Sequence, residues 1–330
     1  MKVLYVVRRS AREDIFPTQK LEELKKLAEV EVTYSTDQQT IKEKVSNVDI
    51  IIAATQIITS EIINAAKKLK MIQVTSAGFE RLDVAAAAAN GVIICNVSGA
   101  NAISVVELCF GMILDLARRI SSTDRLMRAG GWEKAEPERH FDVRNCTLGI
   151  VGLGAIGSYM AKIGKYGFDM MVLAYDPYIS EDRAELVGAK LVDLPTLMKE
   201  SDIVTIHVPF SEATRHLIGE KELGLMKPTA ILVNSARGAL VDEQALIKVL
   251  SDRKISGAGL DVFEIEPLPQ ESPIRKLENV VLYPHGASTI STSKHMYDFA
   301  VENVIRVARG QSPLNIQNPR TYYTSPKWVK

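Results

Sequence analysis

The stretch Cys146–Pro177, CTLGIVGLGAIGSYMAKIGKYGFDMMVLAYDP, decides the fold. An apolar run from Leu148 to Val151 leads into GLGAIG, and a second apolar run ends at Asp176. This pattern predicts a strand, a glycine turn, a helix and a second strand. The glycines allow a tight turn and a close approach of a pyrophosphate, and the unpaired N–H groups at the helix start favour an anion. The stretch therefore predicts a dinucleotide-binding site.

The acid at the end of the second strand indicates which dinucleotide binds. Asp176 lies 19 residues after the last glycine of the motif, which is the position expected of a ribose-binding carboxylate. A carboxylate accepts a hydrogen bond from a ribose 2′-OH, whereas a 2′-phosphate would meet a like charge. Pro177 and Tyr178 follow in place of an arginine. We therefore expect NAD(H) rather than NADP(H).

The composition argues against several classes of partner. The 330 residues include 40 basic and 40 acidic side chains, so the formal net charge is zero. This balance gives no electrostatic reason to expect nucleic acid or a membrane surface as partner. The longest apolar stretch, Ala102–Ala117, is interrupted by two acids and is too short to span a bilayer. The cysteines have no metal-ligand spacing, which predicts buried thiols in a reducing cytoplasm and no metal site; they are Cys95, Cys109 and Cys146.

Two α/β domains are expected because 330 residues exceed what one core usually fills. Strand and helix patterns alternate from the amino terminus to Val74, without a glycine-rich phosphate loop, which predicts a smaller flavodoxin-like domain with a parallel sheet. We assign residues 1–99 to this domain, together with 291–330, because a helix predicted at Thr292–Arg309 returns the chain to it. Residues 100–290 form the Rossmann-like NAD-binding domain, so the first domain is discontinuous.

Several local expectations follow from the same patterns. Asn101–Ile120 carries apolar residues around nearly its whole circumference, which predicts a helix buried on all sides, between domains or between subunits. Residues 124–146 indicate a loose polar connector, and residues 311–330 an ordered arm packed on a surface. Thr59 and Asp83 are expected to cap helices.

Two groups of residues at strand ends could have either a functional or a purely structural role. The loop of Ser76, Ala77 and Gly78 follows the fourth predicted strand, so its backbone N–H groups could hold a substrate carboxylate. A simple turn is the alternative, and we favour the binding role. His207 ends an apolar strand near the expected path of the adenine, and a lone histidine in such a strand is more often structural.

Three later apolar runs end in residues suited to one class of reaction: Arg237, Glu266 and His285. The carboxyl ends of parallel strands meet at one edge of a sheet, so we expect these side chains to converge. Arginine can hold the carboxylate of a 2-oxo acid and polarise its carbonyl group. Histidine can protonate the carbonyl oxygen as a hydride arrives, and glutamate can stabilise the imidazolium. The alternative is a surface Arg–Glu salt bridge beside a histidine that merely ends a strand.

With these residues identified, the chain resembles the D-isomer-specific 2-hydroxyacid dehydrogenase family over nearly its whole length. The resemblance rests on GLGAIG at 152–157 with Asp176, VNSARGALVDEQAL at 233–246, GLDVFEIEPLP at 259–269 and PHGAS at 284–288. It implies that a small 2-oxo acid and its D-2-hydroxy acid are interconverted with NAD(H). It also implies a homodimer built around the helix predicted at 101–120.

The resemblance assigns roles residue by residue. Arg237, Glu266 and His285 would form the catalytic set. The remaining assignments are cofactor contacts: Gly152, Gly154, Ala155, Ile156, Gly157 and Asp176 for the pyrophosphate and ribose, Val208 and Pro209 for the adenine side, and Ser235, Ala236, Asp261, His285 and Ala287 around the nicotinamide.

Departures from the family pattern leave the substrate open. Gly286 follows His285 where the family usually has a bulky aliphatic residue. Residues 51–56, IIAATQ, lack the arginine that phosphoglycerate dehydrogenases often use to hold the substrate phosphate, which favours a substrate of the glyoxylate or hydroxypyruvate type. GANAISVVEL and HGAST nevertheless resemble the phosphoglycerate branch, so D-3-phosphoglycerate dehydrogenase of serine synthesis is the alternative. An NAD(H)-sensing, corepressor-like binding protein is the non-enzymatic alternative.

Overall fold

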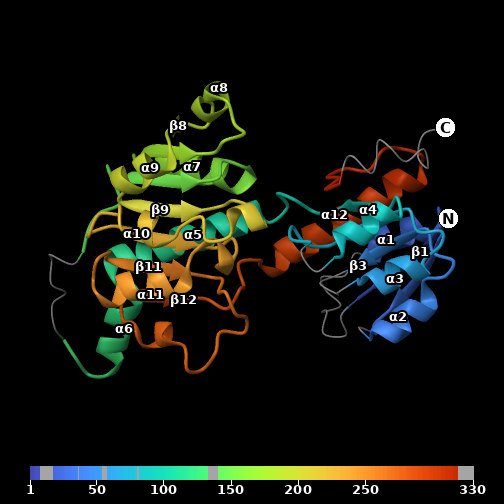
Figure 1. Cartoon of the computed structure of the whole chain (residues 1–330), viewed down its shortest axis with the longest axis horizontal. Coiled ribbons are helices and arrows are strands. Elements are labelled where there is room, and N and C mark those ends of the chain that lie inside the picture. The colour runs from blue at the N-terminus through green and yellow to red at the C-terminus, as the bar shows by residue number, and fades with distance from the viewer. Residues whose placement is uncertain (8–17, 36, 54–57, 80–81, 133–139, 319–330) are drawn as a thin grey trace. The chain divides into compact units, whose positions relative to one another are not determined.

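The computed structural model describes residues 1–7, 18–35, 37–53, 58–79, 82–132 and 140–318. The chain divides into two compact units, drawn in Figure 1. The first comprises Met1–Asn101 and Ser288–Lys330, and the second comprises Ala102–Ala287. The chain thus leaves the first unit, builds the whole second unit, and returns. Within the described residues, no helix combines the length and apolar character needed to cross a membrane.

The first unit contains a five-stranded parallel sheet of the order β2-β1-β3-β4-β5. This is the order of flavodoxin-like folds. Its strands are β1 (Lys2–Val6), β2 (Glu29–Thr33), β3 (Ile50–Ala53), β4 (Met71–Val74) and β5 (Ile93–Cys95). Its helices are α1 (Thr18–Lys25), α2 (Gln38–Lys44), α3 (Ser60–Ala65), α4 (Val84–Ala89) and α12 (Ile290–Ala308). All residues of β3, β4 and β5 are buried, which explains their unbroken apolar runs.

The second unit contains a seven-stranded parallel sheet of the order β12-β11-β10-β9-β6-β7-β8. Its strands are β6 (Thr147–Val151), β7 (Met171–Tyr175), β8 (Lys190–Leu191), β9 (Ile203–Ile206), β10 (Ile231–Asn234), β11 (Gly257–Leu260) and β12 (Val280–Leu282). Its α-helices are α5 (Ala102–Arg118), α6 (Ile120–Arg128), α7 (Ala155–Gly167), α8 (Glu181–Glu185), α9 (Leu194–Glu200), α10 (Glu220–Leu223) and α11 (Glu243–Ser251). This Rossmann-like order reverses between β6 and β9, where ligands bind in open α/β sheets. The predicted fold class, two parallel α/β sheets, is confirmed.

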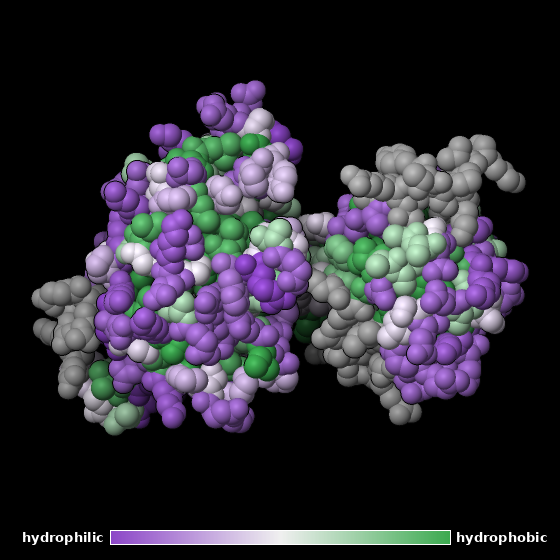
Figure 2. Space-filling view, viewed as in Figure 1, coloured by the Kyte–Doolittle hydropathy of each residue, from purple (hydrophilic) through white to green (hydrophobic). Residues whose placement is uncertain are grey.

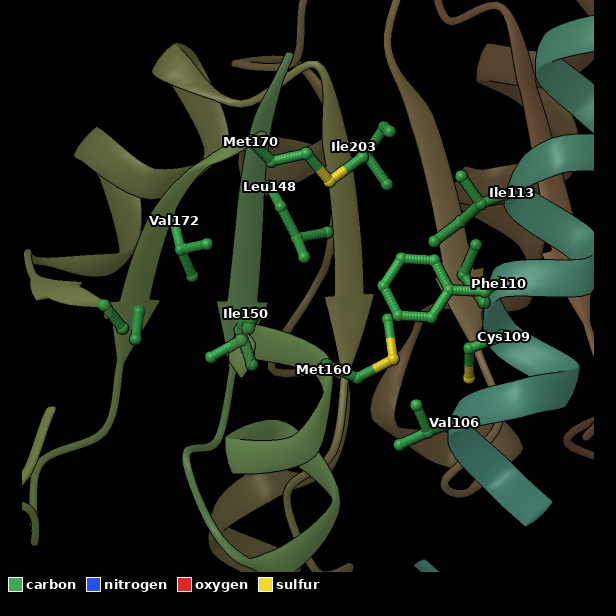
Figure 3. Packing of buried hydrophobic residues seen from close by; sticks show 14 of the residues in the cluster. Val106, Cys109, Phe110, Ile113, Leu148, Ile150, Met160, Met170, Val172 and Ile203 are labelled. Atoms are coloured by element: carbon green, nitrogen blue, oxygen red, sulfur yellow. The ribbon is translucent and has the colours of Figure 1, made fainter. Parts of the chain in front are cut away.

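Helix α5 anchors the core of the second unit. Figure 3 shows Phe110 of α5 pointing toward the sheet, beside Met160 of α7 and near Ile203 of β9. The ring of Phe110 also stacks on that of Phe168, with 5.2 Å between centroids. These residues lie on the face of the sheet that α5 and α7 share, so the glycine turn before α7 is held by a packed core.

The structure corrects two expectations for the segment after Asn101. The helix ends at Arg118, and α6 begins at Ile120, because Arg119 adopts a left-handed backbone with φ of 52°. The expected loose connector at 124–146 is therefore helical as far as Arg128. The single chain does not bury α5 on all sides, so the expected burial between subunits stays a prediction. One stripe of α5 is exposed, because it carries mostly charged or small residues: Ile103, Glu107, Gly111 and Arg118.

Of the two predicted helix caps, one makes the expected side-chain hydrogen bond and the other does not. Asp83 accepts a hydrogen bond from the N–H of Ala86 at 2.8 Å and caps α4 as expected. Thr59 stands at the N-cap position of α3, but its side chain makes no capping hydrogen bond. Its hydroxyl instead pairs with Oε1 of Gln38 at 3.3 Å. The part of the predicted arm beyond Asn318 lies outside the described residues.

Candidate active site

The glycine turn after β6 is shaped by close backbone contacts. Gly152 has φ of 96°, and a Cβ there would lie 2.9 Å from the backbone N of Val208. A Cβ on Gly157 would lie 2.1 Å from the carbonyl oxygen of Gly152. Gly154, in contrast, has no atom within 4 Å of an added Cβ, and both it and Ala155 are exposed. The turn is therefore closely packed at Gly152 and Gly157 and open at Gly154. The open side lies next to the first N–H groups of α7, as a pyrophosphate-binding turn requires.

Asp176 lies beside this turn, directly after β7. Its Oδ2 accepts a hydrogen bond from the N–H of Leu153 at 2.9 Å, and its Oδ1 one from the N–H of Tyr178 at 2.9 Å. Each carboxylate oxygen has a second lone pair for a further donor. The carboxylate is thus fixed at the glycine turn, in a position to accept from ribose hydroxyls.

Arg237 stands on a turn that is held from both sides. Asn234, the last residue of β10, accepts from the N–H of Ala236 at 3.1 Å and donates to the carbonyl of Arg237 at 2.9 Å. A Cβ on Gly238 would lie 1.9 Å from the carbonyl carbon of Phe263. The loop after β10 therefore touches, backbone to backbone, the loop after β11 that carries Glu266.

Glu266 and His285 form a direct pair. Oε2 of Glu266 lies 2.6 Å from Nδ1 of His285, and Oε1 accepts from the N–H of Phe263 at 3.1 Å. His285 has φ of 49°, and its side chain is 49% exposed. Because Nδ1 is engaged by the carboxylate, proton exchange with a substrate would use Nε2.

Asp261, at the end of β11, supports the turn that carries the histidine. Its carbonyl oxygen accepts from the N–H of His285 at 2.8 Å, and its Oδ1 from the N–H of Gly286 at 2.8 Å. The residue is fully buried, and this burial raises the pKa of its carboxyl group. Oδ2 has no hydrogen-bond partner among the described residues. An unsatisfied buried acceptor fits a cofactor that brings an amide donor, as the nicotinamide carboxamide does.

Further predicted cofactor residues follow β9 and β10. Val208 and Pro209 come directly after the β9 end that approaches Gly152. Oγ of Ser235 lies 3.0 Å from Sγ of Cys109 on α5, and burial raises the pKa of this thiol to about 11. Sequence reasoning did not place Cys109 near the site, because no local pattern shows where α5 crosses the sheet. Ala287 packs partly buried against the same core.

His207 has the structural character expected of a lone histidine in an apolar strand. Its Nε2 pairs with the hydroxyl of Thr205 at 2.8 Å, and its Nδ1 is enclosed without a partner among the described residues. Burial lowers the pKa of His207 to about 3. The imidazole is therefore neutral at physiological pH.

We expect this imidazole, whose Nδ1 is enclosed, to make the wild-type protein more acid-sensitive than a His207→Gln variant. Below pH 6.5 the imidazole gains a proton in the unfolded chain but stays neutral in the folded one down to about pH 3. The unfolded state then binds more protons, so the free energy of unfolding falls by at most about 1.4 kcal/mol per pH unit. Urea titrations on both sides of pH 6.5 measure this loss. Identical acid sensitivity of the two proteins would contradict it.

The predicted carboxylate loop lies in the first unit, at the carboxyl end of β4. Its three carbonyl oxygens accept hydrogen bonds from within the unit. The donors are Val97 N to Ser76 O at 3.2 Å, Asn96 Nδ2 to Ala77 O at 2.7 Å, and Ser76 Oγ to Gly78 O at 2.7 Å. The part of the chain that the structure describes offers no acceptor for the N–H groups of Ala77 and Gly78. With respect to the described residues, these two N–H groups are candidates for the predicted contact with a substrate carboxylate.

Comparison with known proteins identifies the framework that holds these residues. Residues 110–287 match the NAD-binding domain of the D-isomer specific 2-hydroxyacid dehydrogenases. The chain belongs to this family. Its D-2-hydroxyacid dehydrogenase domain includes every predicted residue from the glycine turn to Ala287, and the enzymatic class is that of an oxidoreductase.

Members of the 2-hydroxyacid dehydrogenase family resemble the chain over most of its length. A glyoxylate reductase of Thermococcus litoralis is 41% identical over 292 residues, which cover 86% of this chain and 88% of the relative. A D-3-phosphoglycerate dehydrogenase of Methanocaldococcus jannaschii is 39% identical over 89% of this chain but only 56% of its own length. The structure of a D-lactate dehydrogenase from Aquifex aeolicus, complexed with NAD and lactic acid, has a TM-score of 0.80 at 28% identity, with 93% of this chain and 96% of that chain covered.

Proposed function

We propose that the protein is an NAD(H)-dependent reductase of small 2-oxo acids of the glyoxylate and hydroxypyruvate type. The observation that carries this proposal is the 2.6 Å contact between Glu266 and His285 on a turn held by Asp261. The pair stands beside the loop of Arg237 in a 2-hydroxyacid dehydrogenase framework.

In the proposed reaction each residue has one task. NAD(H), when bound, supplies or accepts the hydride. Arg237 binds the carboxylate of the 2-oxo acid and polarises its carbonyl group. His285 donates the proton on Nε2 to the carbonyl oxygen, and in the reverse direction it removes the proton from the hydroxyl group. Glu266 holds the ring through Nδ1, which leaves Nε2 to exchange the proton with the substrate.

We expect NADH to be preferred over NADPH because of Asp176. A 2′-phosphate at the glycine turn would stand against this carboxylate, whose Oδ2 accepts a hydrogen bond from Leu153 in the turn. Like charges in contact cost several kcal/mol, so the preference in kcat/KM should be on the order of 10²-fold. An Asp176→Asn variant keeps most of the hydrogen-bonding capacity and should lose most of this preference. Equal rates of wild-type enzyme with both cofactors would contradict the assignment.

The substrate proposal is tested by following NADH oxidation with glyoxylate, hydroxypyruvate, pyruvate and 3-phosphohydroxypyruvate. Preference for an unphosphorylated acid would support the proposal. A strong preference for 3-phosphohydroxypyruvate would assign the protein to serine synthesis instead, the alternative that the Methanocaldococcus jannaschii relative favours. Residues 51–53 lie in β3 and are buried, whereas 54–57, where a phosphate-binding arginine would be sought, lie outside the described residues.

We also propose that the active form is a homodimer joined through α5 and α6. The exposed stripe of α5 includes Ile103, which is 58% exposed. Helix α6 has no buried residue and leaves Ile120, Leu126 and Met127 exposed. Figure 2 shows hydrophobic surface at the end of the second unit where Figure 1 places α6. Sedimentation of the protein at micromolar concentration would separate a dimer from a monomer.

A further inference from the structure

A segment near the carboxyl end of the described chain pairs with the edge of the first sheet. Residues 314–317 run antiparallel to β5. Gln317 N donates to Ile94 O at 2.8 Å, and Asn96 N donates to Asn315 O at 3.3 Å. The segment thus reaches the sheet next to Asn96, the residue that follows β5.

Asn96 connects this segment to the predicted carboxylate loop. Its side-chain Nδ2 donates to Ala77 O at 2.7 Å. Its Oδ1 accepts from Nε2 of Gln317 at 3.0 Å and from the N–H of Ser98 at 3.2 Å. The residue is 3% exposed, so its amide has little access to water as an alternative partner. A buried amide satisfied in this way is costly to displace.

A second chain of hydrogen bonds joins the same two places. Leu314 N donates to Oδ1 of Asn303 on α12 at 2.7 Å, and Nδ2 of Asn303 donates to Oε1 of Gln73 at 2.7 Å. Nε2 of Gln73 donates in turn to the carbonyl of Val74 at 2.8 Å. Gln73 and Asn303 are 0% and 1% exposed. Val74 is the last residue of β4, two residues before Ser76 of the loop.

We propose that residues 314–317 position the substrate-carboxylate loop, and that Asn96 is the positioning residue through which they act. The proposal rests on the proposed function of the protein and on the role that the sequence predicts for this loop, which is to hold a substrate carboxylate together with Arg237. By holding Ala77 O on the inner side of the loop, Asn96 fixes the peptide plane whose N–H, on Gly78, faces the other way. The segment near the carboxyl end of the described chain therefore sets the direction of the Gly78 N–H, one of the two donors predicted to receive the substrate.

The proposal is tested with two variants of the connection and one matched control. Asn96→Leu removes the donor to Ala77 O, and Gln317→Met removes the side-chain hydrogen bond from the segment to Oδ1 of Asn96. The control is Asn318→Ala. Asn318 also ties the chain to the sheet, through Ile94 N at 2.8 Å and Val92 O at 2.9 Å, but it makes no contact with Asn96.

The expected result is a rise in KM for the 2-oxo acid alone. One lost hydrogen bond corresponds to about 2- to 12-fold, so we expect roughly tenfold for Asn96→Leu and about threefold for Gln317→Met. The KM for NADH should stay within about twofold, because the cofactor residues belong to the second unit. Asn318→Ala should lower the thermal midpoint as much as Gln317→Met does, without changing the KM for the 2-oxo acid.

Amide hydrogen exchange gives a readout independent of activity. In the apoprotein, the peptide containing Ala77 and Gly78 should exchange faster in Asn96→Leu and Gln317→Met than in the wild type and Asn318→Ala. Unchanged exchange and unchanged KM in a folded Gln317→Met protein would overturn the proposal, as would equal effects of the control. If the wild type reduces no 2-oxo acid, the proposed function fails, and the exchange data still decide whether the segment orders the loop.

Discussion

Replacing His285 by alanine is expected to lower kcat with a 2-oxo acid by roughly 10² to 10⁴ fold, the range typical of a lost general acid. The KM for NADH should change little, because the pyrophosphate and ribose positions lie at the glycine turn. Steady-state kinetics of NADH oxidation measure both quantities. Unchanged turnover would remove His285 from the mechanism.

The chain provides a closely matched control for this experiment. His216 also pairs with a glutamate, Glu264, at 2.7 Å, is 42% exposed at the side chain, and has φ of 52°. It does not stand on the turn held by Asp261. His216→Ala should therefore keep kcat within about threefold, since a surface pair of this kind contributes little. An equal loss in both variants would mean that the effect reports loop stability and not proton transfer.

Replacing Gly238 by alanine is expected to lower kcat/KM by on the order of 10²-fold, although glycine performs no chemistry. The new Cβ would lie 1.9 Å from the carbonyl carbon of Phe263 and 2.1 Å from its oxygen, and neither backbone atom can rotate away. The two loops must separate, which shifts Arg237 relative to Glu266. Overpacking of this kind costs about 1–3 kcal/mol, so the midpoint of urea unfolding should also fall.

Gly167→Ala serves as the comparison for this substitution. Gly167 ends α7, and the nearest contact of an added Cβ is 3.6 Å from a side-chain methyl group of Ile163, an ordinary van der Waals distance. The kcat/KM of the Gly167→Ala variant should equal that of the wild type. If Gly238→Ala behaves in the same way, the backbone contact between the loops has no role in holding the site.

The parts of the site that sequence reasoning predicted are those governed by strand ends. Because parallel strands deliver their carboxyl ends to one edge, the pairing of Glu266 with His285 follows from two apolar runs and the residues after them. The break between α5 and α6 was missed because Arg119 adopts a left-handed backbone without being glycine or asparagine. The contact of Cys109 with Ser235 depends on how α5 crosses the sheet, which no local pattern contains.

The packing of α12 on the first sheet determines which of the two units completes its folding last during synthesis. Val301, Val304 and Ile305 of α12 bury their side chains in the same cluster as Val3 and Tyr5 of β1. A ribosome that adds about 5–20 residues per second needs roughly 15 to 60 seconds to pass from the first of these segments to the second. During that interval this face of the nascent sheet lacks α12 and is covered only in part, by Leu21 and Leu24 of α1, while the second unit is being synthesised. The unit whose strands emerge first from the ribosome therefore reaches its final packing last, and this period is when a chaperone would be needed.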